Sequence, residues 1–161
     1  MILRFYAAAF ATLGVGKIPK APGTFGSALA VFIWWQLSPQ PWQKELVWLL
    51  LAFIFGFIAT QLYEKNNHKH DPKEVVVDEL IGMWIALFAV PPTMTNMLFA
   101  FLLFRLFDIW KPFPVGWLDR KVPGALGTIL DDVAAGLIAR FLLQLLIMME
   151  VLATMEFPWN L

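Results

Sequence analysis

Five apolar runs alternate with short polar connections along the chain, and their lengths predict a bundle of membrane helices. The runs cover residues 25–37, 46–63, 75–90, 97–107 and 132–155. The second has about 18 residues and the fifth is longer, so both could cross a bilayer core. The expected fold class is an all-α polytopic membrane bundle of about five helices, and residues 1–13 predict an additional interfacial helix at the N-terminus.

The first, third and fourth runs are short for membrane helices. A sixteen-residue helix rises roughly 24 Å, whereas the hydrocarbon core is ~30 Å thick. The third and fourth runs flank Pro91 and Pro92, which force a turn. These two runs are either short spanning helices or a re-entrant hairpin that protein or water covers. We favour the spanning arrangement.

The basic residues predict how the helices are oriented. They fall in alternate connections, and the turn at Pro91 and Pro92 carries no charge. Because Lys and Arg concentrate in cytoplasmic loops, the N-terminus is expected in the cytoplasm and the C-terminus outside. Most acidic residues lie beside the same basic loops, although the rule does not concern acids. This coincidence indicates a site at the cytoplasmic face.

The composition narrows the possible functions. Of the 161 residues, 60% are hydrophobic and 15% are charged, against about 25% charged in soluble domains. The formal net charge is zero, which gives no support for nucleic-acid binding. Cysteine is absent, so thiolate zinc sites and cysteine nucleophiles are excluded. The length is that of one domain over residues 1–161, and it does not indicate the oligomeric state.

The first cluster of candidate site residues opens the first apolar run. Residues 21–27 (APGTFGS) combine glycines, which let a backbone approach a ligand, with the hydroxyls of Thr24 and Ser27. Lys17 and Lys20 precede them and add positive charge. A helix N-terminus of this kind suits a phosphate group. The alternative is an ordinary helix start with a tight turn.

The second cluster is the pair Asp78 and Glu79 near the beginning of the third run. Two neighbouring carboxylates at an apolar boundary are costly unless a positive group lies nearby. Acids are also favoured in the first turn of any helix, which is the alternative interpretation. Gly82 follows one turn later and would allow another helix to approach closely.

The third cluster ends the fourth run. Arg105, Asp108 and Lys111 are spaced three residues apart, and Pro112 follows them. The spacing predicts one helix face on which an acid lies between two bases, beside an anionic substrate. The alternative is an interfacial salt-bridge ladder.

The fourth cluster is the pair Asp131 and Asp132, which we expect to start the fifth helix. Gly136 and Arg140 follow Asp132 along one stripe of that helix. Capping a helix would explain one aspartate. It would not explain the second aspartate or an arginine inside the membrane.

The predicted topology brings these clusters to one place. The first, third and fifth helices would begin at the cytoplasmic face, and the fourth would end there. Their acids would repel one another and would repel a phosphate. A hard divalent cation removes both repulsions, and Mg²⁺ is the usual choice with oxygen ligands and phosphate. The combination indicates phosphate chemistry on a lipid.

Four segments together resemble the bacterial phosphatidylglycerophosphatase A family. They are residues 16–27 (GKIPKAPGTFGS), 75–82 (VVVDELIG), 104–114 (FRLFDIWKPFP) and 119–136, which ends in LDDVAAG. The resemblance implies a Mg²⁺-dependent phosphatase in the bacterial cytoplasmic (inner) membrane, with its active site facing the cytoplasm. The substrate would be the phospholipid phosphatidylglycerophosphate and the product, in phospholipid biosynthesis, phosphatidylglycerol.

With this resemblance, the candidate residues are expected to have distinct roles. Asp108 would complete the metal shell or orient an attacking water, and an aspartyl-phosphate intermediate stays open as the alternative. The metal ligands would be Asp78, Glu79, Asp131 and Asp132. The substrate-binding residues would be Lys17, Lys20, Thr24, Ser27, Arg105 and Lys111.

Two other functions stay open as alternatives. Residues 136–140 match the G-x-x-A-R part of a CDP-alcohol phosphotransferase motif, but Ala135 replaces the aspartate that this motif requires. A small transporter or ion channel would place its charges along a path through the membrane. In this sequence the charges cluster at one face instead.

Overall fold

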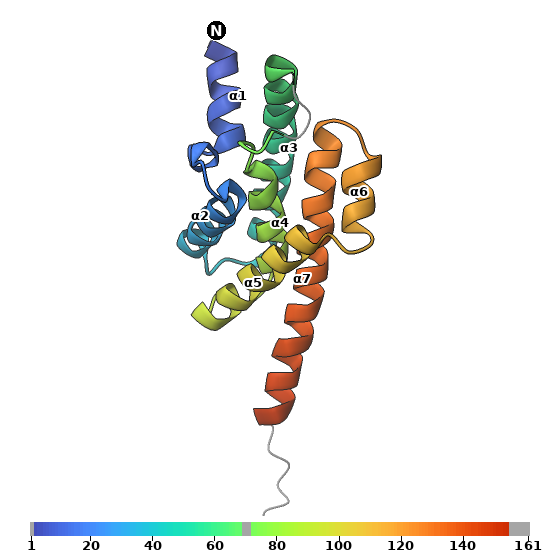
Figure 1. The fold of residues 1–161 in the computed structure, drawn as a ribbon. Coiled ribbons are helices and arrows are strands. Elements are labelled where there is room, and N and C mark those ends of the chain that lie inside the picture. The colour runs from blue at the N-terminus through green and yellow to red at the C-terminus, as the bar shows by residue number, and fades with distance from the viewer. Residues whose placement is uncertain (1, 69–71, 155–161) are drawn as a thin grey trace, which may run out of the picture.

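The computed structural model describes the backbone of residues 2–68 and 72–154, and every regular element in these ranges is a helix (Figure 1). The predicted all-α fold is therefore confirmed. The elements are α1 (Ile2–Thr12), the short 3-10 helix η1 (Val15–Lys17), α2 (Pro22–Leu37), α3 (Trp42–Asn67), α4 (Val77–Leu87), α5 (Met94–Trp110), α6 (Val115–Lys121) and α7 (Ala125–Thr154).

Local sequence signals explain where several helices begin and end. Pro22 occupies the first position of α2, where its missing N–H and fixed φ do not disturb the helix. The hydroxyl of Thr93 caps α5 by accepting the N–H of Asn96 at 3.1 Å. Lys111 ends α5 in a left-handed conformation at φ 49°. Each of these positions fixes one end of a helix that reaches the candidate site.

Helix α4 lies in the middle of the bundle, between α2 and α7 (Figure 1). Nine of its 11 residues are buried. Its crossing with α7 brings Gly82 against Gly136, where a Cβ on Gly136 would collide with the carbonyl of Gly82. The expectation that Gly82 permits close helix approach is confirmed, and the residue it approaches is the glycine on the Asp132 stripe.

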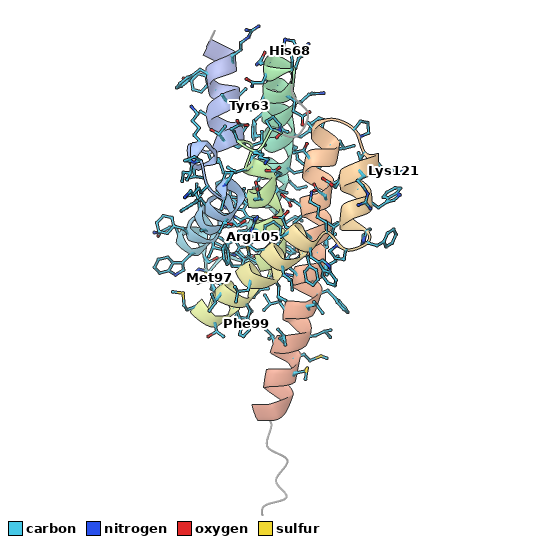
Figure 2. All side chains as sticks on the ribbon, viewed as in Figure 1. Tyr63, His68, Met97, Phe99, Arg105 and Lys121 are labelled. Carbon is cyan, nitrogen blue, oxygen red and sulfur yellow. The ribbon has the colours of Figure 1, made fainter. Side chains whose placement is uncertain are left out.

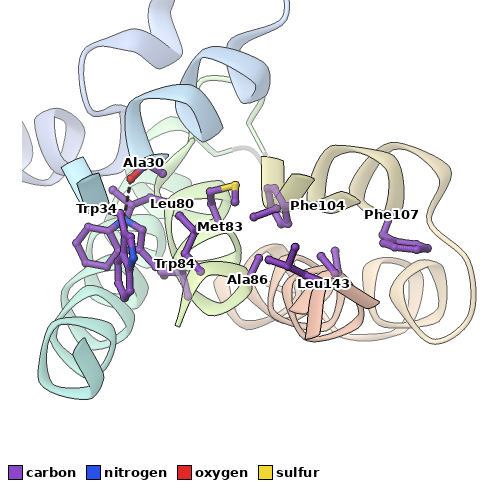
Figure 3. Close-up of a cluster of buried hydrophobic side chains, with 14 of the residues drawn as sticks. Ala30, Trp34, Leu80, Met83, Trp84, Ala86, Phe104, Phe107 and Leu143 are labelled. Carbon is purple, nitrogen blue, oxygen red and sulfur yellow. Dashed lines mark hydrogen bonds between the residues drawn. The ribbon is translucent and has the colours of Figure 1, made fainter. Parts of the chain in front are cut away.

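Large apolar side chains fill the space around α4 (Figure 3). The indole Nε1 of Trp84 donates to the carbonyl of Ala30 at 3.0 Å, which ties α4 to α2. The rings of Trp34 and Trp84 lie 5.5 Å apart. On the other side of α4, Phe104 is fully buried within the same core. Because α4 is held on several sides, the acids in its first turn have fixed positions.

Two helices are long and apolar enough to cross a membrane by length and composition, namely Trp42–Asn67 and Ala125–Met149 with 26 and 25 residues. Helix α4 has only 11 residues and rises about 16 Å, roughly half of a ~30 Å core. This corrects the favoured spanning helix over residues 75–90.

Three further features differ from the expectations. Helix α7 begins at Ala125, so Asp131 and Asp132 lie in its second turn and do not start it. Helix α6 is an unexpected element between the fourth and fifth runs. Arg140 lies with its guanidinium carbon 5.2 Å from the centre of the Phe88 ring, two turns beyond Asp132. The guanidinium of Arg140 therefore packs on Phe88, away from the carboxylate of Asp132.

The helix directions agree with the predicted convergence. Helices α2, α4 and α7 all run broadly downward in Figure 1, and α5 ends beside α7 below the first turns of that helix. Helix α1 packs beside the C-terminal half of α3, where Ala11 and Ala59 share a small buried cluster. The C-terminal half of α7 extends beyond the other helices (Figure 1).

Candidate active site

A polar cavity of about 270 Å³ lies where the start of α2, the first turn of α4, the end of α5 and the second turn of α7 meet. One buried water requires only about 10–15 Å³, so the cavity has room for a larger ligand. Its charged lining consists of five carboxylates and three basic groups: Asp78, Glu79, Asp108, Asp131, Asp132, Lys73, Arg105 and Lys111. The formal charge of this lining is therefore negative.

Three carboxylates in the cavity form a compact cluster. Asp78, Glu79 and Asp132 each offer one oxygen, and these oxygens all lie within 4.8 Å of one another. Oxygens on opposite sides of an octahedral Mg²⁺ are about 4 Å apart, so this spacing fits a single cation. Oε2 of Glu79 and Oδ1 of Asp132 are buried and make no hydrogen bond to any residue that the structure describes. The cluster could hold a metal ion.

Helix α5 supplies an ion pair next to these acids. Arg105 pairs with Asp108 on the same helix, and Figure 2 shows Arg105 where α5 reaches the centre of the molecule. The same Nη1 atom lies 3.5 Å from Oγ of Ser27 on α2. Ser27 is fully buried, and its hydroxyl donates to the carbonyl of Gly23 at 2.8 Å. Ser27 is therefore placed to hold Arg105 rather than to contact a ligand.

Lys111 lines the same cavity as Arg105 and Asp108, but it forms its ion pairs with acids of α6 and α7 and not with Asp108 as expected. Its left-handed backbone directs the ammonium toward Asp119 at 2.6 Å and Asp131 at 2.9 Å. Burial alone would lower the pKa of Lys111, but the hydrogen bonds to Asp119 and Asp131 outweigh it and raise that pKa above its ordinary value. Lys111 thus stays protonated, and its two ion pairs link the end of α5 to α6 and α7.

Asp131 differs from its neighbour Asp132 in its surroundings. One of its oxygens accepts from Lys111, whereas its Oδ1 is buried and has no hydrogen-bond partner among the described residues. The compact cluster contains Asp132 and does not contain Asp131. Both residues line the cavity.

Gly23 allows α2 to approach the acidic cluster. A Cβ at this position would collide with Oε1 of Glu79 and would lie 3.1 Å from Nη1 of Arg105. A larger residue at this position would have to displace the carboxylate of Glu79. The glycine in the first predicted cluster is thus explained by contact with the second and third clusters.

Several expected ligand-binding residues lie away from the cavity lining. Lys17 and Lys20 are exposed, Thr24 is partly buried, and none of the three lines the cavity. Two residues that the sequence did not single out do line it, namely Lys73 before α4 and Thr128 on α7. The hydroxyl of Thr128 donates to Glu64 on α3 at 2.9 Å. The helical pattern gave no signal for them because their positions depend on contacts between distant helices.

Comparisons with known proteins identify the family. The family model described as phosphatidylglycerophosphatase A matches residues 8–147. The chain belongs to this family. It is 39% identical over 127 residues to phosphatidylglycerophosphatase A of Escherichia coli (strain K12), covering 78% of this chain and 74% of that protein. The family is one of phosphoric monoester hydrolases, so the expected enzyme class is confirmed.

Two further relatives have similar coverage. Phosphatidylglycerophosphatase A of Haemophilus influenzae is 37% identical over 131 residues, with 78% of each chain covered. A Bacteroides thetaiotaomicron protein, named provisionally as a phosphatidylinositol-3-phosphatase, is 38% identical over 130 residues, covering 76% of this chain and 81% of that protein. No solved structure matches this chain.

Proposed function

We propose that this protein is a Mg²⁺-dependent phosphatase that converts phosphatidylglycerophosphate into phosphatidylglycerol and phosphate. The observation that carries the proposal is the group of three clustered carboxylates beside basic residues in one cavity. The names of the relatives in Escherichia coli and Haemophilus influenzae support this substrate. The names of the relatives and the carboxylate cluster concern the same part of the chain, because the family match includes every residue that lines the cavity.

The residues present fit a hard divalent cation. Asp78, Glu79 and Asp132 would hold it, because each offers an oxygen close to the others, and Glu79 and Asp132 each also have a buried oxygen without a hydrogen bond to described residues. Oxygen donors of this kind favour Mg²⁺ over softer metals. When bound, Mg²⁺ would offset the charge of the carboxylates and of the phosphate. Asp131 would hold Lys111 in place beside the metal site through their ion pair.

The basic residues of the cavity would bind the substrate phosphate. Arg105 is held in place by Asp108 and Ser27, and guanidinium groups suit phosphate oxygens. Lys111 keeps its charge, and Lys73 lies at the exposed side of the cavity. Lys17, Lys20 and Thr24 remain proposed as residues that attract the headgroup from outside the cavity. Ser27 is reassigned from substrate binding to positioning Arg105.

The proposed reaction is the hydrolysis of a phosphate ester. A water oxygen forms a new bond to phosphorus, the bond between phosphorus and the glycerol oxygen breaks, and that oxygen takes up a proton. Asp108 borders the cavity and is the carboxylate proposed to orient the water. Direct attack by an aspartate, followed by hydrolysis of the phosphoenzyme, is the alternative route.

We also propose that the protein is a multi-pass protein of the bacterial cytoplasmic membrane whose cavity opens to the cytoplasm. Helices α3 and α7 would cross the bilayer. Helix α4 would enter the bilayer but is too short to cross it. A helix end within the bilayer is tolerated here because neighbouring helices cover the backbone of α4. Many large apolar side chains on α2, α3, α5 and α7 are exposed, as lipid contact requires.

Phosphate release by the purified full-length chain in detergent tests this function. Phosphatidylglycerophosphate should release phosphate, EDTA should stop the reaction, and added Mg²⁺ should restore it. Asp132→Asn should lower kcat by roughly 100-fold or more, since even indirect metal-site changes cost 10–100-fold. Glu74→Gln is the matched control because Glu74 does not line the cavity.

The same assay separates the possible lipid substrates. Phosphatidylinositol 3-phosphate is the second substrate to compare, because one relative is named for it. A preference for that lipid would contradict the proposed substrate while leaving the metal site intact. Turnover that is unaffected by EDTA would contradict the metal-dependent mechanism.

A further inference from the structure

An apolar groove of about 230 Å³ runs between α2 and α5. Its lining contains no charged side chain. The residues are Ala28 and Val31 on α2, and Met94, Met97, Leu98 and Phe101 on α5. A groove of this composition suits a hydrocarbon ligand and offers no hydrogen-bonding side chain to a polar one.

The groove and the candidate active site are lined by residues of the same two helices. Gly23 on α2 and Arg105 on α5 line the polar cavity. Ala28 follows Gly23 by five residues, and Phe101 precedes Arg105 by four. At 1.5 Å per residue, the groove begins roughly 6–8 Å from the polar cavity. Figure 2 shows Arg105 and, farther from the site, Met97 on the same helix.

The groove is closed on its inner side and open to the surroundings of the protein. Met97 is only 3% exposed, whereas Met94 and Leu98 are 70% and 55% exposed. Methionine side chains adapt their shape to flexible apolar ligands. An elongated apolar molecule could therefore enter from the side of the bundle without passing through its core.

The distance along α5 from Arg105 to the far end of the groove is close to the thickness of one leaflet of a bilayer. Met94 precedes Arg105 by eleven residues, which corresponds to about 16 Å along α5. Half of the ~30 Å hydrocarbon core is about 15 Å. A phospholipid whose phosphate lies beside Arg105 would therefore have a chain of suitable length for the whole groove.

We propose that the groove between α2 and α5 binds an acyl chain of the phospholipid substrate while the headgroup phosphate occupies the polar cavity. This inference rests on the proposed function, because it assigns a lipid to the site. It adds a determinant of substrate recognition outside the polar cavity: apolar side chains on α2 and α5 would select phosphate esters that carry long chains.

A second apolar groove, of about 310 Å³, lies between α1, α2, α3 and α4. It is the competing location for the chain. Two of its helices, α1 and α3, contribute no residue to the polar cavity, whereas both helices of the groove between α2 and α5 also line that cavity. Gly26 of α2 packs against Val76, and this contact lies between the second groove and the polar cavity. The contacts therefore favour the groove between α2 and α5.

The experiment compares two substrates with the full-length chain in detergent. One is phosphatidylglycerophosphate with long acyl chains, and the other is the same headgroup with both chains removed. Ala28→Trp and Leu98→Trp each place a large side chain in the groove at an exposed position. Each should lower kcat/KM about tenfold for the long-chain lipid and leave it within about twofold for the soluble headgroup.

Two further variants serve as controls. Ala9→Trp makes the same change on an exposed position of α1 and should alter neither substrate. Leu51→Trp fills the competing groove and should also preserve the ratio between the substrates. An unchanged ratio in Ala28→Trp and Leu98→Trp, or a changed ratio in Leu51→Trp alone, would overturn the assignment. Absence of phosphate release from both substrates with the unmodified chain would instead refute the proposed function.

Discussion

At the scale of single residues, the charges of the candidate site are arranged by contacts between helices. Arg105 lies between Asp108 and Ser27, and Lys111 lies between Asp119 and Asp131. These pairings commit two bases to particular acids. The oxygens of Asp78, Glu79 and Asp132 lie within 4.8 Å of one another, and a divalent cation is the group that this arrangement favours.

The raised pKa of Lys111 leads to a prediction about the pH profile. A lysine is half-protonated at about pH 10.4 when unperturbed, and Lys111 holds its proton more tightly than that. Its charge, and the stability that depends on this charge, should persist below the unfolded pKa and be lost only as the pH rises through the higher folded pKa. Phosphate release between pH 7 and about 10 should therefore show no loss caused by Lys111.

The variant Lys111→Arg checks this, because arginine stays charged over the whole range. The unmodified chain and the variant should have pH profiles of the same shape, whatever their absolute rates. A decline in the unmodified chain near pH 9 that the variant abolishes would contradict the assignment.

The sequence predicted part of this residue-level arrangement. The acids Asp78, Asp108 and Asp132 were expected at one place, and they line one cavity. The partners of Lys111 were not predictable, since Asp119 and Asp131 lie eight and twenty residues away and reach it only through α6 and α7. Helical spacing gives information about one helix face, and it cannot identify partners on another helix.

At the scale of elements, the crossing of α4 and α7 holds the two halves of the acidic cluster together. Asp78 and Glu79 come from α4, and Asp132 comes from α7. Gly82 and Gly136 let the two helices approach at this level. Small residues at such crossings are typical of helices that pack within membranes.

The crossing can be tested with Gly136→Leu. The added side chain would meet the backbone of Gly82, which cannot move independently. Overpacking of this kind typically costs roughly 1–3 kcal/mol. The variant should unfold at a lower temperature in detergent and lose phosphate release, whereas Ala9→Leu on the exposed side of α1 should change neither. A stable and active Gly136→Leu protein would exclude this role for the crossing.

The boundaries of the elements were only partly predictable. The apolar runs located α2, α3, α4, α5 and α7. Helix α4 stops earlier than its run because the chain turns at Ala89, whose N–H donates to the carboxylate of Glu45 on α3 at 2.7 Å. Helix α6 was missed because it is seven residues long and carries Asp119, Arg120 and Lys121. A short polar segment of this kind is typical of a loop.

At the scale of the whole molecule, the apolar outer surface and the polar cavity imply a defined placement in a bilayer. Lys44 precedes the apolar part of α3 and is exposed, and Lys121 at the end of α6 is also exposed. The proposed topology places these two residues on opposite sides of the membrane. The absence of cysteine allows each position to be labelled singly without background.

Lys44→Cys and Lys121→Cys test the topology with a membrane-impermeant maleimide. In inside-out vesicles Lys121→Cys should react and Lys44→Cys should not, and right-side-out vesicles should give the opposite result. The unmodified chain controls for background, and both variants should react after solubilisation. Reaction of both positions from the same side would contradict the proposed topology.

Binding of Mn²⁺, which accepts the oxygen ligands that Mg²⁺ uses, tests the central claim most directly. Electron paramagnetic resonance on the purified full-length chain should detect bound Mn²⁺ that Mg²⁺ displaces. Asp132→Asn should weaken this binding by roughly tenfold or more, and Glu74→Gln should leave it unchanged. If Mn²⁺ binds the unmodified chain and Asp132→Asn with equal affinity, or binds neither, the acidic cluster is not the metal site.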